Sequence, residues 1–269
     1  MTQRLIEQYK DSSNLDARIA LHARFSTNPY PWYQWMFDHY ADLPDAARIV
    51  TVGCGPGTLW TKARDRVPDG WRVLLTDFSP GMVAQARDSL AVTLPGFDFA
   101  VANAQAIPCA DGVCDAVFAN HMLYHVPDRP RALAELRRVL KPGGALYATT
   151  VGDRHMVEMW RLIAPVIPDI LEKVRHVSRG FTLENGGAQL APCFASVTRD
   201  DYADSLALTE VEPLIAYLKS SFTLSADWLN KLVEVGFAPL RQRVAAEIAE
   251  KGAFHITKAS GMFIARTLP

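Results

Sequence analysis

The sequence predicts an α/β fold organised around a parallel, doubly wound sheet, and three observations predict it. Short apolar runs alternate with amphipathic segments between residues 48 and 151. The first run breaks into glycines at alternate positions, Gly53, Gly55 and Gly57, and the second run ends in a carboxylate, Asp77. Alternating strands and helices are typical of a parallel sheet that binds ligands at the carboxyl ends of its strands.

The first strand is the β-branched run at residues 48–52, which favours a strand buried on both faces. Gly53 and Gly55 follow it and allow positive φ, so backbone N–H groups can approach a ligand without a Cβ in the way. Residues 58–66 then predict the helix that packs on this strand. The sequence therefore predicts a strand that delivers a ligand-binding turn.

The second strand covers residues 71–77 and ends in Asp77, about twenty residues after the glycines, the spacing at which an acid reaches a pair of ribose hydroxyls. Ser79 and Pro80 predict a helix start, with Ser79 as the N-cap and Pro80 in the first helical position. Asp77 alone could simply cap a strand end. Its pairing with the glycine turn favours ligand binding.

Three further strands are predicted at residues 97–101, 114–120 and 145–151. An amphipathic helix at 129–140 precedes the last of them, and Lys141-Pro142-Gly143-Gly144 closes that helix. Beyond Gly152 the alternation stops. We expect helices over 156–174 and from Ser225 to Lys251, a strand over 197–209, a short helix over 212–218, and a final extended region over 254–265.

Helical patterning over residues 1–28 lies ahead of the first strand, and an aromatic-rich segment follows it at 32–40. Trp32 and Trp35 have helical spacing, so one interpretation is a helix packed on the sheet. The other is an aromatic rim for a substrate or a cationic cofactor, because ring faces attract cations. Both interpretations can hold together.

The composition favours small-molecule chemistry. The formal net charge of the 269 residues is −1 and no basic block occurs, which argues against nucleic-acid binding. No apolar run approaches the ~18 residues that a membrane span needs, and the first residues contain no apolar signal core. Four cysteines without CxxC pairing suit a reducing compartment. We expect a cytoplasmic protein with structural cysteines.

Five ordered motifs resemble the class I S-adenosylmethionine-dependent methyltransferases, in their methyltransferase 11-like small-molecule branch. The motifs are Val50-Thr51-Val52-Gly53-Cys54-Gly55-Pro56-Gly57, Thr76-Asp77-Phe78-Ser79-Pro80-Gly81-Met82, Asn103-Ala104-Gln105-Ala106-Ile107-Pro108, Cys114-Asp115-Ala116-Val117 and Leu140-Lys141-Pro142-Gly143-Gly144. The resemblance implies a Rossmann-like, mostly parallel seven-stranded sheet whose last strand is antiparallel. It also implies S-adenosylmethionine as the cofactor.

The expected organisation is an N-terminal helical lid (1–44), an S-adenosylmethionine-binding core (45–151), a cap insertion after strand five (152–195) and a C-terminal completion of the sheet (196–269). The resemblance implies that residues of the lid and the core contact the cofactor. These residues are Tyr9, Arg24, Gly53, Gly55, Asp77, Phe78, Asn103, Ala104 and Asn120. Among these, Asp77 would bind the ribose hydroxyls, Phe78 would pack on adenine and Arg24 would meet the cofactor's carboxylate.

The chain departs from the family pattern at two positions. Asn103 stands where an aspartate usually accepts from the adenine amine, and its amide oxygen can still accept that bond. Thr51 stands where an acid commonly precedes the glycines, which puts one polar contact to the cofactor in doubt.

Methyl transfer is an in-line displacement in which a sulfonium loses its charge, so alignment and desolvation dominate catalysis. A base helps if the acceptor is a hydroxyl, an amine or a ring N–H, and His125 is the candidate, just past the fourth strand. A histidine that is only hydrogen-bonded at a helix edge is the alternative. His121 and His125 lie four residues apart, but no third ligand accompanies them, so we predict no metal.

Trp32, Trp35 and Tyr124 are the candidate substrate contacts, and a small aromatic or heterocyclic acceptor of secondary metabolism is the expected substrate. The sequence does not resolve C-, N- or O-methylation, or the oligomeric state. A non-catalytic S-adenosylmethionine-binding module is the alternative. A nicotinamide-dependent oxidoreductase is disfavoured because Thr58 replaces the third glycine of G-x-G-x-x-G.

Overall fold

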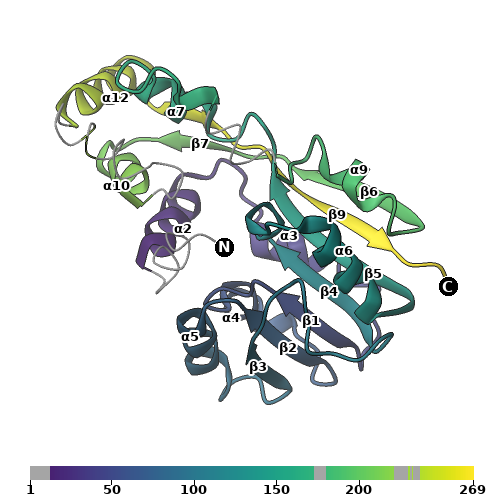
Figure 1. Ribbon diagram of the computed structural model, residues 1–269. Helices are drawn as coiled ribbons and strands as arrows, with labels where there is room; N and C mark the ends of the chain where they lie inside the picture. The colour runs from purple at the N-terminus through teal and green to yellow at the C-terminus, as the bar shows by residue number, and fades with distance from the viewer. Residues whose placement is uncertain (1–12, 173–179, 221–229, 231, 233–236) are drawn as a thin grey trace.

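A computed structural model describes residues 13–172, 180–220, 230, 232 and 237–269 (Figure 1). Its main element is a seven-stranded sheet in the order β3-β2-β1-β4-β5-β9-β6. The five strands that were predicted up to residue 151 are β1 (Arg48–Val52), β2 (Arg72–Asp77), β3 (Phe97–Val101), β4 (Cys114–Asn120) and β5 (Leu140–Val151). They pair in parallel, with β1 between β2 and β4. The strand order reverses at β1, where a ligand crevice opens in such sheets.

The C-terminal strand β9 (Ser260–Arg266) completes the sheet in the antiparallel direction. It pairs with β5 on one side and with β6 (Ser196–Tyr202) on the other. The mostly parallel seven-stranded sheet with an antiparallel last strand is therefore confirmed. β6 forms one edge of the sheet and carries Arg199, Asp200 and Asp201 at successive positions. Charged side chains at an edge disfavour pairing with a further strand.

Helices cover both faces of this sheet. One face packs against α3 (Trp32–Asp38), α4 (Thr58–Lys62) and α5 (Pro80–Leu90), and the other against α6 (Arg129–Val139) and α9 (Gly186–Leu190). Ser79 caps α5 as predicted, because its Oγ accepts a hydrogen bond from the Met82 N–H at 3.3 Å. Two short 3₁₀ turns, η1 (Arg64–Arg66) and η2 (Leu123–His125), follow α4 and β4.

A second hydrophobic core lies beside the sheet and forms what we call the small lobe. Its elements are α2 (Ser13–Phe25), α7 (Val157–Ile163), β7 (Ser205–Leu208), α10 (Glu212–Ser220), α12 (Ala238–Lys251) and β8 (Phe254–Thr257) (Figure 1). β7 and β8 pair in an antiparallel two-stranded sheet. The small lobe thus draws on the expected lid, cap and C-terminal segments, and their boundaries stay a proposal.

Two expected elements are shorter than predicted. The strand expected over 197–209 is split between the large sheet (β6) and the small one (β7), because the chain turns at Asp204. That carboxylate accepts hydrogen bonds from the Ser26 hydroxyl and the Asn28 N–H, which fixes the turn. The helix expected over 156–174 ends at Ile163, ahead of Pro165 and Pro168, which lack the N–H a helix needs.

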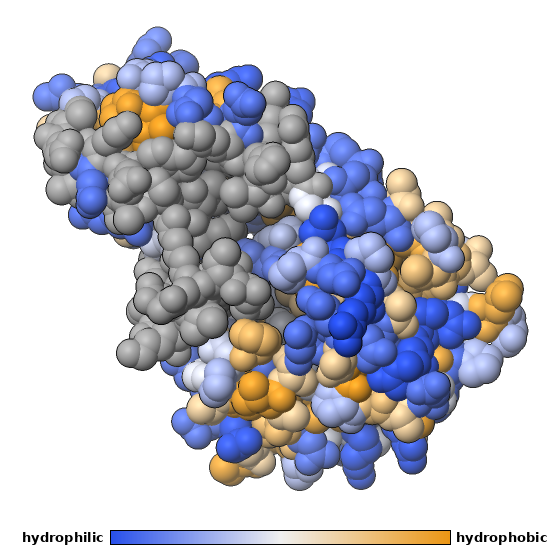
Figure 2. All heavy atoms as spheres, in the orientation of Figure 1, coloured by the Kyte–Doolittle hydropathy of each residue, from blue (hydrophilic) through white to orange (hydrophobic). Residues whose placement is uncertain are grey.

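The helix expected from Ser225 to Lys251 is not continuous. α12 begins at Ala238, next to Pro239, after the non-helical N-cap Phe237, whereas residues 230 and 232 are helical and the other residues of 225–236 lie outside the described residues. Within the part of the chain that the structure describes, no helix combines the length and the apolar character that crossing a bilayer requires. On the face shown in Figure 2, hydrophilic residues predominate and hydrophobic ones lie between them in small groups.

Candidate active site

A cavity of about 1080 Å³ lies between the carboxyl ends of the parallel strands and the small lobe. This volume is at the upper end of the range of small-molecule sites. The glycine turn, the ends of β2 and β4, α2 and the start of β9 all contribute to its wall. It is therefore the candidate site for a cofactor together with an acceptor.

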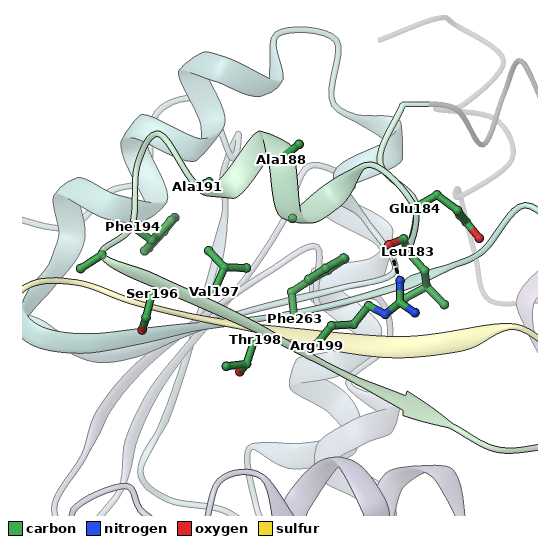
Figure 3. Close-up of a pocket in the computed structure, with 12 residues that line it drawn as sticks. Leu183, Glu184, Ala188, Ala191, Phe194, Ser196, Val197, Thr198, Arg199 and Phe263 are labelled. Carbon is green, nitrogen blue, oxygen red and sulfur yellow. Dashed lines mark hydrogen bonds between the residues drawn. The ribbon is translucent and has the colours of Figure 1, made fainter.

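A second, more open depression of about 670 Å³ lies between α9 and β6 (Figure 3). Its charged side chains already have protein partners. Arg199 donates from Nη1 to the Leu183 carbonyl at 2.7 Å, and the Glu184 carboxylate accepts from the Asp153 N–H at 3.1 Å. Its remaining wall is mostly small and apolar, with the hydroxyl groups of Ser196 and Thr198, so it has fewer polar groups than the large cavity.

The glycine turn and Asp77 form the base of the large cavity. Gly53 and Gly55 have φ values of 63° and 55°, as the sequence predicts. The Asp77 carboxylate accepts from the Gly55 N–H at 2.9 Å through Oδ2 and from the Ser79 N–H at 2.8 Å through Oδ1. The Phe78 N–H is a third donor to this carboxylate. The two oxygens together offer about four acceptor positions, so capacity for a ligand hydroxyl remains. Burial raises the pKa of this carboxyl, and the N–H donors oppose that shift.

The other predicted contacts at the strand ends also line the cavity: Phe78, Asn103, Ala104 and Asn120. Phe78 is 40% exposed, although it is a large apolar side chain next to the carboxylate. The Asn103 amide oxygen accepts from the Gln105 N–H at 2.9 Å and retains one lone pair. An exposed ring beside an amide acceptor is an arrangement that fits a purine.

Thr51 gives an independent test of whether a cofactor fits here. Its side chain lines the cavity, yet the residue is only 3% exposed. Among the described residues its Oγ1 has no hydrogen-bond partner. A buried polar atom without a partner is costly and is usually explained by a functional role or an absent ligand. The residues present therefore fit a polar ligand at the position where the family commonly has an acid.

Aromatic rings also line the cavity. Trp32 contacts the ring of Tyr202, with centroids 5.0 Å apart, and stacks on Trp35 at the same separation. Trp32 and Tyr124 line the cavity, whereas Trp35 packs behind Trp32 and does not. α3 packs on the sheet through Met36 and Phe37, as the first interpretation predicts, and it also presents Trp32 to the cavity, as an aromatic rim requires.

Four histidines come together in the same wall: His22, His121, His125 and His155. Burial lowers the pKa of His22 to about 3 and the pKa values of His121 and His125 to about 4. It also lowers the pKa of His155 well below its ordinary value. The rings are therefore neutral at pH 7, and His125 is a weaker base than the sequence-based hypothesis assumes.

A buried ion pair lies in the same wall of the cavity. Lys258 Nζ pairs with the Asp204 carboxylate, and their side chains are 8% and 0% exposed. Lys258 lines the cavity and lies over the ring of Tyr202, 5.6 Å from its centroid. The carboxylate keeps Lys258 in place, since the hydrogen bonds from Ser26 and Asn28 hold Asp204 in the turn.

Arg24 does not lie at the site. Its guanidinium pairs with Glu210, and both side chains are about half exposed. The arginine that lines the cavity is Arg18, which is 9% exposed. Arg18 and His22 lie one helical turn apart on the face of α2 that meets the cavity, whereas Arg24 lies on another face. Arg18, and not Arg24, is therefore the arginine in a position to meet a ligand in the cavity. Tyr9 lies outside the described residues.

Sequence reasoning missed several residues of the cavity wall: Arg18, His22, His155, Tyr202, Tyr217 and Lys258. None belongs to a motif, and they come from segments far apart along the chain. For two of these residues the sequence did contain a signal, because Arg18 and His22 are four residues apart and therefore share one face of the N-terminal helix. Among the described residues, no group of three or more histidine, cysteine or acidic side chains is arranged to hold a metal ion.

The "Methyltransferase domain" family matches residues 50–148, which span β1 to β5 and include the glycine turn, Asp77, Asn103 and Asn120. A malonyl-[acyl-carrier protein] O-methyltransferase of Geobacter sulfurreducens is 36% identical over 120 residues, 45% of this chain and 44% of the relative. A trans-aconitate 2-methyltransferase of Variovorax paradoxus is 36% identical over 104 residues, 39% of this chain and 38% of the relative. The chain spans less than half the length of these curated relatives.

Among solved structures, the [4+2]-cyclase SpnF has a similar fold. The TM-score is 0.60 at 18% sequence identity, and the superposition covers 98% of this chain and 95% of the cyclase. The likeness extends the shared fold beyond the matched domain to the small lobe. The domain match is consistent with the order of the seven strands and with the glycine turn and Asp77, so residues 50–148 resemble the methyltransferase domain of class I S-adenosylmethionine-dependent enzymes.

Proposed function

We propose that this chain transfers a methyl group from S-adenosylmethionine to a small-molecule acceptor, with an aromatic or heterocyclic compound of secondary metabolism as the favoured class. The observation that carries the proposal is the base of the large cavity. There Asp77 retains acceptor positions while it is bonded to the glycine turn. The unpartnered hydroxyl of Thr51 and the exposed ring of Phe78 border the same space.

In this proposal Asp77 binds the ribose hydroxyls and Asn103 accepts from the adenine amine, while Phe78 packs on the purine. Arg18 replaces Arg24 as the partner of the cofactor's carboxylate. When bound, S-adenosylmethionine supplies an electrophilic methyl group on a sulfonium. The chain's own contribution is alignment and exclusion of water, which in well-oriented reactions account for ~7–11 kcal/mol of the barrier.

The large cavity supports an acceptor in the same chamber as the cofactor. Trp32, Tyr124 and His125 line the same cavity as Asp77 and Phe78. The aromatic surface of Trp32 and Tyr202 favours a planar acceptor. We propose a cytoplasmic setting, which the four free cysteines support.

The alternative is a protein that binds S-adenosylmethionine and does not transfer its methyl group. The similarity to a protein named as a cyclase favours keeping this alternative, because a fold does not determine a reaction.

The deciding experiment incubates the protein with methyl-labelled S-adenosylmethionine and a panel of phenols, N-heterocycles, amines and carboxylic acids. Label transfer with equimolar S-adenosylhomocysteine is expected. Calorimetric binding of S-adenosylhomocysteine without label transfer to any member would support the alternative. Absence of binding would reject both.

A further inference from the structure

His121 lies at the centre of the four cavity histidines. It follows directly on β4, and its backbone N–H donates to the Thr149 carbonyl of β5 at 3.0 Å. His121 contributes to the lowered pKa values of His22, His125 and His155, so it lies near all three rings. His22 descends from α2 and meets His155 with ring centroids 5.9 Å apart. The cluster thus spans the sheet and the small lobe.

His121 is held in a backbone conformation that few residues adopt. Its φ is 51°, in the left-handed region that a side chain disfavours. Met156, beside His155, has a φ of 59° and also lines the cavity. Strained residues of this kind persist where the surroundings fix them and cluster at functional sites. The His121 ring lies beside Trp32, and the two ring centroids are 5.6 Å apart.

Two rings of the cluster, His22 and His155, retain hydrogen-bonding capacity. The Ala259 N–H donates to His155 Nδ1 at 3.3 Å, so the neutral His155 ring carries its proton on Nε2 and can donate there. Among the described residues, His22 Nδ1 has no partner. Neutral imidazoles each combine one donor and one acceptor. A group that both donates and accepts satisfies such a wall whichever tautomers are present.

Cationic side chains near the cluster disfavour a cationic acceptor. Lys258 contributes to the lowered pKa values of His22, His121 and His155, and Arg18 to those of His22 and His125. The charge of Lys258 is compensated by Asp204, so Arg18 is the main source of repulsion. Lys258 also occupies a face of the Tyr202 ring, where an ammonium could otherwise bind. An ether or a methyl ester accepts hydrogen bonds but cannot donate one. A neutral hydroxyl both donates and accepts a hydrogen bond and carries no positive charge, so it fits the cluster and its surroundings.

We propose that His121, with His22 and His155, forms the acceptor subsite of the cavity and binds the hydroxyl of a planar, uncharged acceptor against Trp32. The proposal rests on the proposed methyltransferase function and deepens it, because it selects O–H acceptors over amines. The histidines orient the hydroxyl rather than deprotonate it. They act as hydrogen-bonding groups, and Trp32 supplies the flat surface.

The first experiment measures binding of four naphthalene probes by calorimetry, with and without saturating S-adenosylhomocysteine. The probes are 1-naphthol, 1-methoxynaphthalene, 1-naphthylmethylamine and 1-naphthoate. 1-Naphthol is expected to bind at least about tenfold more tightly than the ether and the amine, the factor that one net hydrogen bond supplies. Equal or tighter binding of the ether, the amine or the carboxylate would overturn the proposal.

The second experiment separates binding from structure at His121. His121→Gly relieves the left-handed strain and His121→Ala retains it, while both remove the ring. Both variants should lose about tenfold in affinity for 1-naphthol and keep their affinity for S-adenosylhomocysteine, and the glycine variant should be the more stable one. His255→Phe, at an exposed histidine of β8, is the control and should leave binding unchanged.

The outcomes distinguish the two proposals. If the protein fails to bind S-adenosylhomocysteine but prefers 1-naphthol through His121, the proposed function fails and the subsite stands. If S-adenosylhomocysteine binds and the His121 variants bind 1-naphthol like the unaltered chain, the subsite is wrong and the proposed function is unaffected.

Discussion

The carboxylate of Asp77 accepts a hydrogen bond from the backbone N–H of Gly55 at 2.9 Å, across the ends of two neighbouring parallel strands. The acid at the end of β2 therefore stabilises the turn at the end of β1. One side chain thus has two roles, since it orders the glycine turn and also presents its remaining lone pairs to the cavity.

Replacing Asp77 with Asn should weaken S-adenosylhomocysteine binding by at least about tenfold, because the amide has a single acceptor oxygen and no charge. Isothermal titration calorimetry measures this change. Asp98→Asn is the matched control, as Asp98 is an exposed acid on the neighbouring strand β3 and its variant should bind normally. Equal affinities of the two variants would remove Asp77 from the binding site.

Gly53→Ala and Gly112→Ala form a second matched pair. The φ values are 63° and 62°, so both alanines should cost roughly 1–2 kcal/mol of stability for left-handed backbone. At Gly53 a Cβ would lie 2.7 Å from Met122 Cβ, whereas at Gly112 it meets nothing within 4 Å. The clash should cost a further ~1–3 kcal/mol and reduce cofactor binding. Urea unfolding and calorimetry test both expectations.

Thr51→Val removes a hydroxyl that has no hydrogen-bond partner among the described residues. The free protein should keep or gain stability, by up to about 1 kcal/mol, while affinity for S-adenosylmethionine should fall about tenfold. Thr76→Val is the contrast, because the Thr76 hydroxyl donates to the Thr51 carbonyl at 3.0 Å and its loss should cost about 1 kcal/mol. A destabilised Thr51→Val protein with normal affinity would contradict the assignment.

The buried histidines predict a dependence of stability on pH. Their pKa values in the folded chain, about 3 for His22 and about 4 for His121 and His125, lie below the unfolded value of about 6.5. Between these values the unfolded chain binds protons that the folded chain does not, so stability falls as pH falls below about 6.5. Tm should drop by a few degrees between pH 7 and pH 5.

Differential scanning fluorimetry across this range measures the drop. His22→Phe should reduce it, and His255→Phe should not, because His255 is exposed. The window ends at pH 5 so that titration of the acidic side chains contributes little. A Tm of the unaltered chain that is flat between pH 7 and pH 5 would contradict the expected burial of these rings.

The sequence predicts the sheet well because its signals are local. The strand at 48–52, the glycines and the cap at Ser79 are each determined by a few neighbouring residues, and their predictions are confirmed. The part of the cavity at Gly53, Gly55 and Asp77 follows from the same logic, because parallel strands bring their carboxyl ends to one edge.

The rest of the cavity wall is formed by segments that only tertiary contacts bring together, and there the predictions were incomplete. Arg24 was a candidate because an arginine can bind a carboxylate. The helical periodicity of α2 places Arg18 at the cavity instead, and Arg24 pairs with Glu210. His155 and Lys258 reach the site through the small lobe, whose strand β7 was predicted as part of one longer strand. The turn at Asp204 depends on Ser26 and Asn28, almost two hundred residues earlier, which no local pattern reveals.

The segments that connect the small lobe to the sheet also build the cavity wall. Ser26 and Asn28 lie between α2 and α3, His155 between β5 and α7, and Lys258 between β8 and β9. A ligand that fills the cavity would therefore contact the sheet and the segments that lead into the small lobe at the same time. Its binding free energy would add to the contacts that hold the two parts together, so a saturating ligand should raise the stability of both.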